Sequence, residues 1–442
     1  MKKDNQKTVG EPKKDLMEKV VSLCKRRGFV FQGSEIYGGM AGSFDYGPLG
    51  VTLKNNIKNL WWKMFVENRT DIYGVDAALL MNPKVWEASG HIGGFSDPLV
   101  ECKKCKRRFR ADHLEDKKKC PECEGELGTE RQFNMMFKTH VGATEDDASV
   151  SYLRPETAQG IFVNFKNVLD SFHPKLPFGI AQIGKAFRNE IAPRDFVFRT
   201  REFEQMEIEY FIQEKDWENQ FEYWRKAVHE WLKLIGLHGG HVSELEIAPA
   251  DRAHYSKRTI DFEYEFPFGK KELYGLAYRT DFDLSKHSAE SDADLSYFEE
   301  ETKTRFTPHV IEPSFGVDRT FLAVLCEAYT EDELGGEPRT YLKFPPNIAP
   351  VKIAVFPLLK NKPELVEKAR EIFAELKATF GAVVFDDNGN IGKRYRRQDE
   401  IGTPYCVTID FDTLEDNAVT IRNRDTGEQE RVVVSDIVKK II

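Results

Sequence analysis

The chain of 442 residues is 40% hydrophobic and 31% charged, a balance typical of folded soluble proteins that excludes a mainly disordered chain. Its net charge of −9 excludes a surface that attracts nucleic acid everywhere, so any polyanion must be bound by a local basic patch. No run of about 18 apolar residues occurs and residues 1–20 lack the apolar core of a signal peptide, so we expect a cytoplasmic protein that does not enter membranes.

Two amphipathic helices are predicted near the amino terminus, after a polar stretch at 1–14 that is typical of a loose tail. Residues 14–27 place apolar side chains at helical spacing, and Gly28 ends this helix. The segment 28–50 is rich in glycine and aromatic residues, which predicts short strands and turns. The second helix is predicted over 53–69.

Four of the seven cysteines form two CxxC pairs in the segment 98–130. These are Cys102, Cys105, Cys120 and Cys123. Each pair turns two thiolates toward one ion, and the loop between the pairs has the length of a zinc-ribbon finger. Four unrelated free cysteines would have to produce this double spacing by chance. We therefore predict a structural Zn²⁺ with a closed shell of four sulfur ligands, in a ribbon inserted into a larger domain.

Between 178 and 211 the pattern changes to period two, which predicts two antiparallel strands joined by a turn at APRDF. In such strands Arg188 shares a face with Glu190, and Phe203 shares one with Glu207. An arginine fork fits phosphate or carboxylate, an aromatic ring stacks on a purine, and a carboxylate accepts from an amine. These parts indicate a pocket for a nucleotide beside an amine-bearing acid. A surface sheet with many salt bridges is the alternative.

The remaining elements divide the chain into two kinds of structure. A long helix is predicted at 216–236, alternating strands within 260–284, and a strand-to-helix unit at 310–329. The stretch 335–350 is dense in proline and glycine and predicts a domain boundary. Beyond it apolar strands alternate with helices, which predicts a small α/β domain with a largely parallel or mixed sheet. The predicted fold class is therefore α+β, with an antiparallel-rich body followed by an α/β module.

Several motifs resemble the class II aminoacyl-tRNA synthetases. FRNE at 187–190 followed by RTREFEQ is similar to their motif 2, and GVDR at 316–319 with its apolar helix is similar to motif 3. DYGPLG, MNPKVWEASGH, RPETAQG, YRTDFDL, EPSFGVDR and GKRYRRQDEIGTPYCV further resemble the glycyl-tRNA synthetases of the homodimeric type. The resemblance runs from about residue 14 to the end of the chain. Motif 1, where the family builds its dimer interface, falls around Trp61 and the strand leading to Pro83.

The resemblance implies a catalytic domain with an antiparallel sheet over 1–348, the zinc ribbon inserted at 98–130, and an anticodon-binding domain over 349–442. It implies that glycine and ATP react to glycyl-adenylate and pyrophosphate, and that glycine then passes to the 3′ end of tRNA(Gly). Because a substrate carboxylate attacks the α-phosphorus directly, the protein contributes positioning and charge neutralisation. The implied partners are glycine, ATP with Mg²⁺, tRNA(Gly) and a second copy of the chain.

Two arginines carry the catalytic role that the resemblance implies. Arg188 is expected to bridge the α-phosphate and the attacking carboxylate, and Arg319 to bind the γ-phosphate of a bent ATP. Phe203 is expected to stack on adenine, and Glu272, with Leu273, is the candidate magnesium ligand. The residues implied to contact ATP are Arg188, Asn189, Glu190, Phe198, Arg199, Thr200, Arg201, Glu202, Phe203, Glu272, Leu273, Gly316, Val317, Asp318 and Arg319.

Glycine offers only an ammonium, a carboxylate and two hydrogens, so its pocket must bind both ends and exclude larger side chains sterically. The resemblance implies that Glu156, Glu312 and Ser314 hold the ammonium and that Arg279 faces the carboxylate. The residues implied to contact glycine are Arg110, Glu156, Phe203, Glu204, Gln205, Met206, Glu207, Arg279, Glu312, Pro313, Ser314, Phe315 and Gly316. A role in a structural ion pair is the alternative for each charged member, above all for Arg110 and Arg279.

The carboxyl-terminal module resembles the anticodon-binding domain of class IIa synthetases. Its segment 392–402 carries the residues implied to contact tRNA, namely Lys393, Arg394, Tyr395, Arg396 and Arg397. Cations beside a tyrosine suit phosphate contact and base stacking in a single-stranded loop. Outside such a module, a run of charges like this is more often a solvated helix face.

Two other functions compete with a glycine-specific enzyme. One is a synthetase-like subunit that regulates or binds RNA without activity, and the other is a synthetase for another small amino acid. The presence of Arg188 and Arg319 favours an enzyme, and the EPSFG and RPET segments favour glycine. Members of the family vary in the cysteine-bearing insertion, so the zinc prediction depends on the cysteine spacing of this chain alone.

Overall fold

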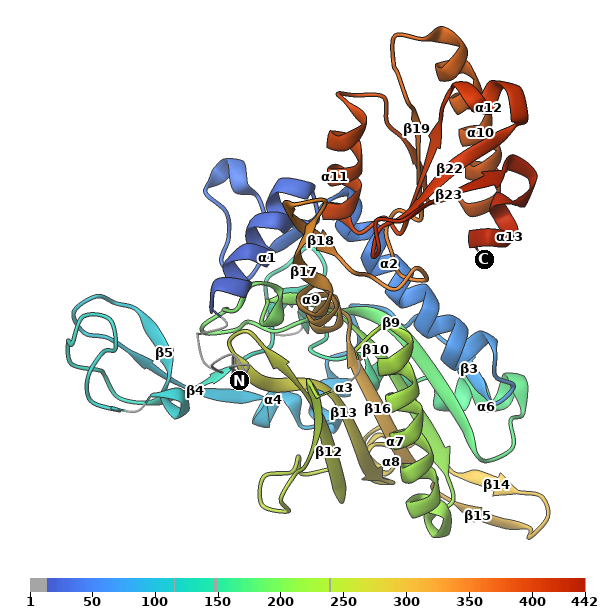
Figure 1. Ribbon diagram of the computed structural model, residues 1–442. Coiled ribbons are helices and arrows are strands. Elements are labelled where there is room, and N and C mark those ends of the chain that lie inside the picture. Colours follow the sequence, from blue (N-terminus) through green and yellow to red (C-terminus); the bar gives the residue numbers. More distant parts are fainter. Residues whose placement is uncertain (1–13, 115, 147–148, 238–239, 442) are drawn as a thin grey trace, which may run out of the picture.

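The computed structural model describes residues 14–114, 116–146, 149–237 and 240–441. The predicted amino-terminal tail falls almost entirely on residues outside this description. Figure 1 shows a large body built around a twisted sheet, with a smaller carboxyl-terminal module beside it. Within the described residues, no helix combines the length and apolar character needed to cross a membrane.

The body contains a seven-stranded sheet with the order β11-β12-β13-β16-β10-β9-β3. All neighbours are antiparallel except the edge strand β3, which runs parallel to β9. This arrangement confirms the predicted antiparallel core. The strands are β3 (Ile72–Gly74), β9 (Phe178–Phe187), β10 (Glu202–Ile212), β11 (Val242–Glu246), β12 (Arg258–Phe266), β13 (Gly269–Thr280) and β16 (His309–Gly316).

One face of the sheet is covered by helices α2 (Pro48–Trp62), α7 (Trp217–Leu234) and α9 (Val317–Ala328). Alternate residues of each strand point to this face, so β10 contributes Met206 and Ile208 to its hydrophobic core. The aromatic rings of Trp61 and Phe65 reach the same core from α2 and the π-helical turn that continues it, Lys63–Glu67. The predicted helices at 53–69 and 216–236 are thereby confirmed.

The opposite face of the sheet is apolar at one end and polar over the rest. Helices α5 (Ala158–Phe162), α6 (Phe165–Phe172) and α8 (Phe282–Ser291) cover the apolar end, where Phe211 packs against Phe165 and Phe178. The other residues of β10 that point to this face are polar or aromatic. They are Phe203, Gln205, Glu207 and Glu209. Buried charges on a sheet face require hydrogen-bond or ion-pair partners. The cavity described below lies on this polar part of the face.

The predicted strand pair at 178–211 forms, but it is shorter than the alternation suggests. β9 and β10 pair only from Phe187 and Glu202 onward, and the residues between them form a loop. Phe196–Phe198 is a turn of 3-10 helix, and Asp195 and Phe196 have positive φ angles of 60° and 57°. The prediction of an extended strand at 198–201 and of a shared strand face for Arg188 and Glu190 is therefore wrong, because this backbone turns back on itself.

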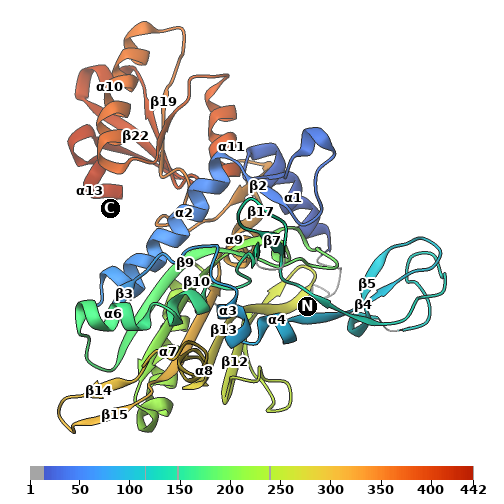
Figure 2. The ribbon, with the colours of Figure 1, turned by 180° about the vertical axis from the view of Figure 1, so that it is seen from behind.

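Smaller elements surround the sheet. The predicted first helix is confirmed as α1, and the cysteine-bearing segment forms a three-stranded ribbon, β5-β4-β6, that projects away from the body in both views (Figures 1 and 2). The bounds of these and the remaining elements of the body are α1 (Lys14–Arg27), β1 (Val30–Gln32), β2 (Phe44–Tyr46), α3 (Lys84–Ala88), α4 (His91–Gly94), β4 (Ser96–Glu101), β5 (Arg108–Arg110), β6 (Arg131–Asn134), β7 (Lys138–His140), β8 (Val150–Tyr152), β14 (Tyr297–Glu299) and β15 (Thr304–Phe306).

The stretch predicted as an irregular boundary, 335–350, is irregular only in part. Glu337–Leu342 is strand β18, which forms a hairpin with β17 (Tyr329–Leu334) and lies against the module. Cross-strand pairing satisfies this backbone despite Pro338, because proline is tolerated on a two-stranded edge.

The module has a mixed five-stranded sheet, as predicted, with the order β20-β19-β21-β22-β23. β19, β20 and β21 are parallel, whereas the hairpin β22-β23 adds two antiparallel strands. The elements of the module are β19 (Ile353–Pro357), α10 (Pro363–Phe380), β20 (Val383–Phe385), α11 (Ile391–Ile401), β21 (Tyr405–Ile409), α12 (Phe411–Asp416), β22 (Ala418–Asn423), β23 (Gln429–Val433) and α13 (Ile437–Ile441).

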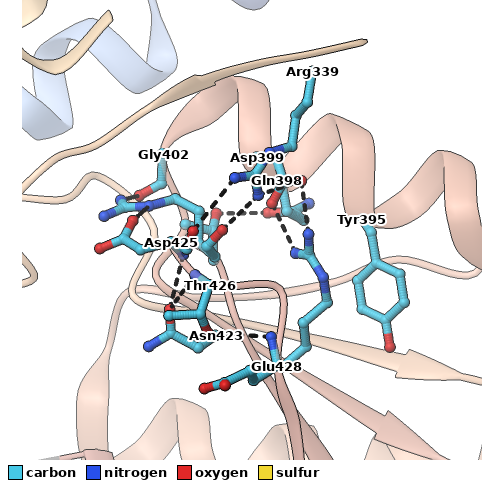
Figure 3. Close-up of polar contacts among 12 residues, drawn as sticks. Arg339, Tyr395, Gln398, Asp399, Gly402, Asn423, Asp425, Thr426 and Glu428 are labelled. Carbon is cyan, nitrogen blue, oxygen red and sulfur yellow. Dashed lines mark hydrogen bonds and ion pairs between the residues drawn. The ribbon is translucent and has the colours of Figure 1, made fainter. Parts of the chain in front are cut away.

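A buried cluster of arginines around Asp399 joins the module to the β17-β18 hairpin (Figure 3). Arg422 donates two hydrogen bonds to the Asp399 carboxylate, at 2.8 and 2.9 Å, and Arg339 of β18 approaches the same carboxylate at 3.6 Å. Arg424 donates to the carbonyl oxygens of Gly402 and Phe344. The four side chains are between 0% and 4% exposed, so the cluster is part of the interior.

Candidate active site

A cavity of about 360 Å³ lies on the polar face of the sheet. It is bordered by the loop after β9, the start of β10, the middle of β13 and the junction of β16 with α9. The residues predicted from the sequence that line it are Glu156, Arg188, Phe198, Arg199, Thr200, Phe203, Glu204, Gln205, Glu207, Glu272, Leu273, Glu312, Ser314, Gly316, Asp318 and Arg319. Segments that lie far apart in the chain thus meet in one place.

Two arginines at this cavity are held against aromatic rings. The guanidinium of Arg188 lies 5.3 Å from the ring centre of Phe203, and its Nε donates to the Pro155 carbonyl oxygen at 3.0 Å. The guanidinium of Arg319 lies 4.5 Å from the ring centre of Phe198 and forms an ion pair with Glu272 at 3.2 Å. Both cations are fixed beside flat apolar surfaces, an arrangement that suits an anion attached to a planar ring.

A group of acids lies at the opposite side of the cavity. Glu207 accepts hydrogen bonds from Ser314 Oγ and Gln205 Nε2, both at 2.8 Å, and from the Thr157 hydroxyl. Glu312 is on the neighbouring strand and 7% exposed. Burial raises the pKa of Glu312 to about 8 and raises the pKa of Glu207 as well. This side of the cavity therefore offers hydrogen-bond acceptors at high density.

Arg279 is buried among these acids, with 1% of its surface exposed. It donates two hydrogen bonds to Asp283 at 2.8 Å and one to Glu312 at 2.7 Å, and it stacks on Tyr255 at 3.8 Å. Arg279 does not border the cavity directly. Its position corresponds to the ion-pair alternative of the sequence prediction, because its donors are directed at protein carboxylates.

Glu156 is connected to the same network through Gln159. The amide nitrogen of Gln159 donates to Glu156 and to Asp283, both at 3.0 Å, and its oxygen lies 2.7 Å from His287 Nε2. His91 lies 3.4 Å from the Glu156 carboxylate. Although burial opposes ionisation, His91 and Arg279 hold the pKa of Glu156 below its usual range. Glu156 is therefore ionised in this cavity.

A third network lies behind the β10 strand, on the side of α2. Lys54 of α2 is 7% exposed and forms ion pairs with Glu204 and Asp318, both at 2.8 Å. The backbone N–H of Glu204 donates to Asp318 at 2.7 Å. The carboxylates of Glu204 and Asp318 are thus used within the protein, and they hold β10, α9 and α2 together beside Phe203 and Arg319.

Some residues predicted to contact substrate have side chains elsewhere. Met206, Phe315 and Val317 pack in the hydrophobic core, so only their backbone can face the cavity. The others outside the lining are Arg110, Asn189, Glu190, Arg201, Glu202, Arg279 and Pro313.

Arg110 and Arg201 are used within the protein. Arg110 forms ion pairs with Asp97 and Asp112, both at 2.7 Å, at the base of the ribbon. Arg201 donates to the carbonyl oxygens of Ala41 and Glu190. Side-chain contact between Arg110 and glycine, as expected from the sequence, has no support from this geometry.

The four ribbon cysteines meet at one point. Their sulfur atoms lie within 4.8 Å of one another, with Cys102 and Cys123 3.5 Å apart and Cys105 and Cys120 3.7 Å apart. A tetrahedral zinc site with Zn–S bonds of about 2.3 Å has sulfur separations of about 3.8 Å. The backbone N–H of Cys105 is directed at Cys102 Sγ, and this contact lowers the pKa of Cys102 to about 6. The donor set therefore fits a closed zinc shell.

Comparisons with known proteins agree with this geometry. Residues 137–329 match the family model described as the tRNA synthetase class II core domain (G, H, P, S and T), and residues 352–442 match the anticodon binding domain. Prolyl-tRNA synthetase of Giardia lamblia, solved with prolyl-adenylate, superposes with a TM-score of 0.70. The match covers 97% of this chain and 79% of that one at 16% identity, so it shows a shared fold.

Curated relatives identify the family within this fold. The chain is 52% identical to the glycine–tRNA ligase of Bacillus thuringiensis subsp. konkukian, over 95% of this chain and 97% of the relative. It is 51% identical to the glycine–tRNA ligase of Treponema denticola, over 98% and 97%. The chain belongs to the glycine–tRNA ligase family. It has the class II synthetase core that its motifs predicted, and it is an aminoacyl-tRNA ligase by family.

Helix α11 carries the residues expected to contact tRNA in this member of the glycine–tRNA ligase family. Arg394 is 1% exposed and donates to the carbonyl oxygens of Pro357, Asp387 and Gly389. Arg397 is paired with Asp386 at 2.7 Å, and Tyr395 Oη lies 2.7 Å from Thr408 Oγ1. Contact between Arg394 and RNA is excluded in this arrangement, because its donors hold the module together.

Lys393 differs from its neighbours on α11 in that its side chain is exposed. Arg396 is half-buried and forms an ion pair with Glu337 of β18 at 3.2 Å. Lys393 is therefore the residue of the predicted group best placed to reach a ligand outside the protein.

Sequence reasoning missed several members of the site. Gln159, Asp283 and His91 lie within the RPETAQG, YRTDFDL and MNPKVWEASGH segments, so the motifs contain them, but the sequence does not show that they bond to Glu156 and Arg279. Asp261 also lines the cavity, and its burial raises its pKa to about 7. No motif marks it, because it is one acid in an ordinary alternating strand.

Proposed function

We propose that this chain is a glycine–tRNA ligase that activates glycine with ATP to glycyl-adenylate and transfers glycine to the 3′ end of tRNA(Gly). The observation that carries the proposal is the charge division of a single cavity. Arg188 and Arg319 stand beside aromatic rings at one side, and Glu156, Glu312 and Ser314 stand at the other. A phosphate, a purine and an ammonium can thus be bound within one reaction distance.

ATP is proposed to bind at the side of the cavity that carries Arg188 and Arg319. We propose that Phe203 stacks on adenine, that Arg188 binds the α-phosphate and the attacking carboxylate, and that Arg319 binds the terminal phosphate. A fixed guanidinium stabilises charge that develops during transfer without reorganising at that moment. Glu272, half-exposed beside Arg319, is the proposed ligand of the Mg²⁺ that neutralises the phosphates of bound ATP.

The glycine half falls to the acid side. The ammonium is proposed to bind among Glu156, Glu312 and Ser314, whose side chains border the cavity. Arg279 acts in this proposal by holding Glu312 and Asp283 in place, rather than by contacting the glycine carboxylate as the sequence suggested. Arg110 anchors the ribbon through Asp97 and Asp112.

The remaining features of the proposal concern the whole protein. We propose that the catalytic domain comprises 1–348, with the ribbon at 98–130, and that 349–442 binds the anticodon region of tRNA. Lys393, Arg396 and Arg397 are the proposed tRNA contacts on the module. The protein is further proposed to work as a homodimer in the cytoplasm, with a structural Zn²⁺ in the ribbon.

Amino-acid-dependent exchange of pyrophosphate into ATP tests the proposed reaction. The purified full-length protein is assayed with glycine, alanine and serine in parallel. Exchange with glycine alone is the expected result. Exchange that requires alanine or serine would reassign the amino acid, and a lack of exchange with all three would support a subunit without activity.

The ribbon predicts about one zinc ion per chain, bound by the four thiolates. Metal analysis of the purified protein measures this content directly. The double variant Cys102→Ser/Cys105→Ser removes one CxxC and is expected to lose the zinc, whereas Cys326→Ser, at a buried cysteine outside the ribbon, is expected to keep it. A wild-type protein purified without zinc that cannot be loaded with it would refute the site.

A further inference from the structure

Glu209 is a buried acid behind the cavity that the proposed reaction does not use. It lies on β10 two residues after Glu207, and 0% of it is exposed. Neither of its carboxyl oxygens has a hydrogen-bond partner among the described residues. Buried polar groups are nearly always hydrogen-bonded, so an isolated carboxyl group in a folded protein needs a physical reason.

Acids surround Glu209. Glu312 on β16 is its cross-strand neighbour, because Glu207 pairs with Ser314 and Tyr210 pairs with Ile311. On the other side, β9 presents the uncharged residues Ile180 and Gln182. The charged and titratable groups that face this region are Glu207 on β10, Glu312 on β16, Arg279 on β13, Asp283 and His287 on α8, Arg154 and Glu156 before α5, His91 on α4 and Tyr255. Arg154 directs its donors at the carbonyl oxygens of Ala77 and Lys185.

The cations near Glu209 are too few for these acids. The Arg279 guanidinium donates two of its hydrogen bonds to Asp283 and a third to Glu312. Burial lowers the pKa of His287, so this ring is neutral near pH 7. Adjacent carboxyl groups in a dry interior cannot both ionise without a cation between them. Burial accordingly raises the pKa of Glu209 well above its usual range, and the neighbouring Glu312 raises it further.

We propose, on the basis of the function proposed above, that Glu209 and Glu312 hold one proton between them in the substrate-free protein and that the ammonium of glycine expels this proton into solvent. The ammonium brings the positive charge that the proton supplied. Glu312 then becomes a carboxylate that accepts from the ammonium, and the charge of the cluster is unchanged. Glu209 lies behind Glu312, so it is a positioning residue that acts through its neighbour.

The direction of the pH effect follows from this exchange of a proton for an ammonium. While the cluster holds its proton, glycine must displace it, so the apparent affinity for glycine rises with pH by up to about tenfold per pH unit. Once the pH is high enough for the substrate-free cluster to have lost its proton, the affinity becomes independent of this group.

Glu209→Gln tests the role of this residue, because glutamine keeps the shape of the protonated acid and cannot lose a proton. With a neutral amide beside it, Glu312 is expected to ionise at lower pH. The KM for glycine in pyrophosphate exchange should then be nearly constant between about pH 6.5 and 8, while the wild-type KM falls with pH by up to about tenfold per unit. The kcat is expected to change by less than about twofold, because the variant alters ground-state binding.

Calorimetry counts the proton directly. Glycine is titrated into the full-length protein in two buffers with different ionisation enthalpies at about pH 7, and the difference in heat gives the protons released. We expect about one for the wild-type protein and close to zero for Glu209→Gln. Glu218→Gln is the matched control, since Glu218 is an exposed acid on α7, which covers the opposite face of the sheet.

The possible results separate this inference from the function on which it rests. Glycine binding without proton release by the wild-type protein would overturn the inference and leave the proposed ligase intact. A wild-type pH profile in Glu209→Gln would also overturn it. If Glu209→Gln fails to fold, the wild-type calorimetry decides alone. A protein that binds no glycine at any pH would refute both proposals.

Discussion

Two buried clusters of this protein combine arginine and carboxylate side chains in different proportions. At the cavity, Arg279 is the arginine that donates to a group of acids formed by Glu156, Glu207, Glu209, Asp283 and Glu312, and Arg154 interacts with Glu207 while donating to backbone carbonyl oxygens. In the carboxyl-terminal module and the hairpin beside it, three buried arginines each have an acid partner: Arg422 pairs with Asp399, Arg339 with Asp332, and Arg424 with Asp425.

The two clusters differ in how their charged groups are satisfied. Arginine has five N–H donors and can direct them at backbone carbonyl oxygens, as Arg424 does with Gly402 and Phe344. An ionised carboxylate is an acceptor only, so a surplus of acids needs donors that the neighbouring acids cannot supply. The module cluster is therefore complete by itself, whereas the cavity cluster is completed by protons or by a cationic ligand. A surplus of buried acids thus marks the functional site here, whereas buried arginines that each have an acid partner mark a structural joint.

The largest expected effect is on stability, in the module. Asp399→Ala leaves Arg422 without its buried counter-charge, which we expect to cost about 3–5 kcal/mol. All six tryptophans lie before residue 349, so tryptophan fluorescence reports the body alone and far-UV circular dichroism reports both parts. In urea, the dichroism of the variant should change before its fluorescence does.

Pyrophosphate exchange by Asp399→Ala, measured below the unfolding temperature, should match that of the wild type. Glu415→Ala, at an exposed acid of α12, is the control and should alter neither property. Lost exchange by a folded Asp399→Ala protein would remove the contrast between the two clusters.

The next effect is on chemistry, at the cavity. Arg319→Ala removes a fixed cation from the proposed phosphate site and should lower kcat for pyrophosphate exchange by about 10²–10³-fold. Its unfolding midpoint should stay close to the wild-type value, since Arg319 is only partly buried and its partner Glu272 is half-exposed. Arg305→Ala, at an exposed arginine of the β14-β15 hairpin, serves as the control. Full activity in Arg319→Ala would refute the phosphate role.

A smaller effect is expected at the acid side. Ser314→Ala removes a hydroxyl that donates to Glu207 and is a proposed acceptor for the ammonium. Loss of a hydrogen bond to a charged group costs about 1.5–3 kcal/mol, so the KM for glycine should rise about 10- to 100-fold with little change in kcat. Ser314→Thr keeps the hydroxyl and should recover part of the affinity. A change in kcat alone would show that Ser314 acts in the transition state rather than in glycine binding.

The smallest effect concerns the surface of α11. Lys393→Ala removes an exposed cation, so tRNA charging should show a KM for tRNA raised a few-fold and a slope against salt concentration reduced by about one. Exchange without tRNA should be unchanged. The adjacent Arg394→Ala should instead destabilise the module, because Arg394 binds backbone carbonyl oxygens of the interior. Equal behaviour of the two variants would contradict the division of roles on this helix.

Much of this fold could be predicted from period and spacing. Helix α1 matches its predicted range from Lys14 to Arg27, and α9 begins where glycine ends the preceding strand. The paired CxxC spacing predicted a cluster of four sulfurs, which the structure contains. These predictions depend on residues that are close together in the sequence, and such short-range patterns can be identified without knowledge of the fold.

The parts that could not be predicted depend on partners far away in the chain. Alternation on β10 shows two charged faces, but only packing against α2 and α5 decides which one borders the cavity. Arg279 and Arg394 both look like ligand-binding cations in the sequence, and both are buried with protein acceptors. The loop at Arg188–Arg201 continues the alternating pattern of its neighbours, yet positive φ angles at Asp195 and Phe196 turn its backbone.

The ion pairs of Lys54 connect helix α2 to two elements that border the cavity. Lys54 binds Glu204 on β10 and Asp318 on α9, and these residues directly adjoin Phe203 and Arg319. Because both ion pairs share the Lys54 ammonium, a displacement of α2 would affect both of them together. The ring proposed to hold adenine and the arginine proposed to hold the terminal phosphate are therefore linked through one lysine of α2. A contact that stabilises α2 thus also stabilises the position of these two side chains relative to each other.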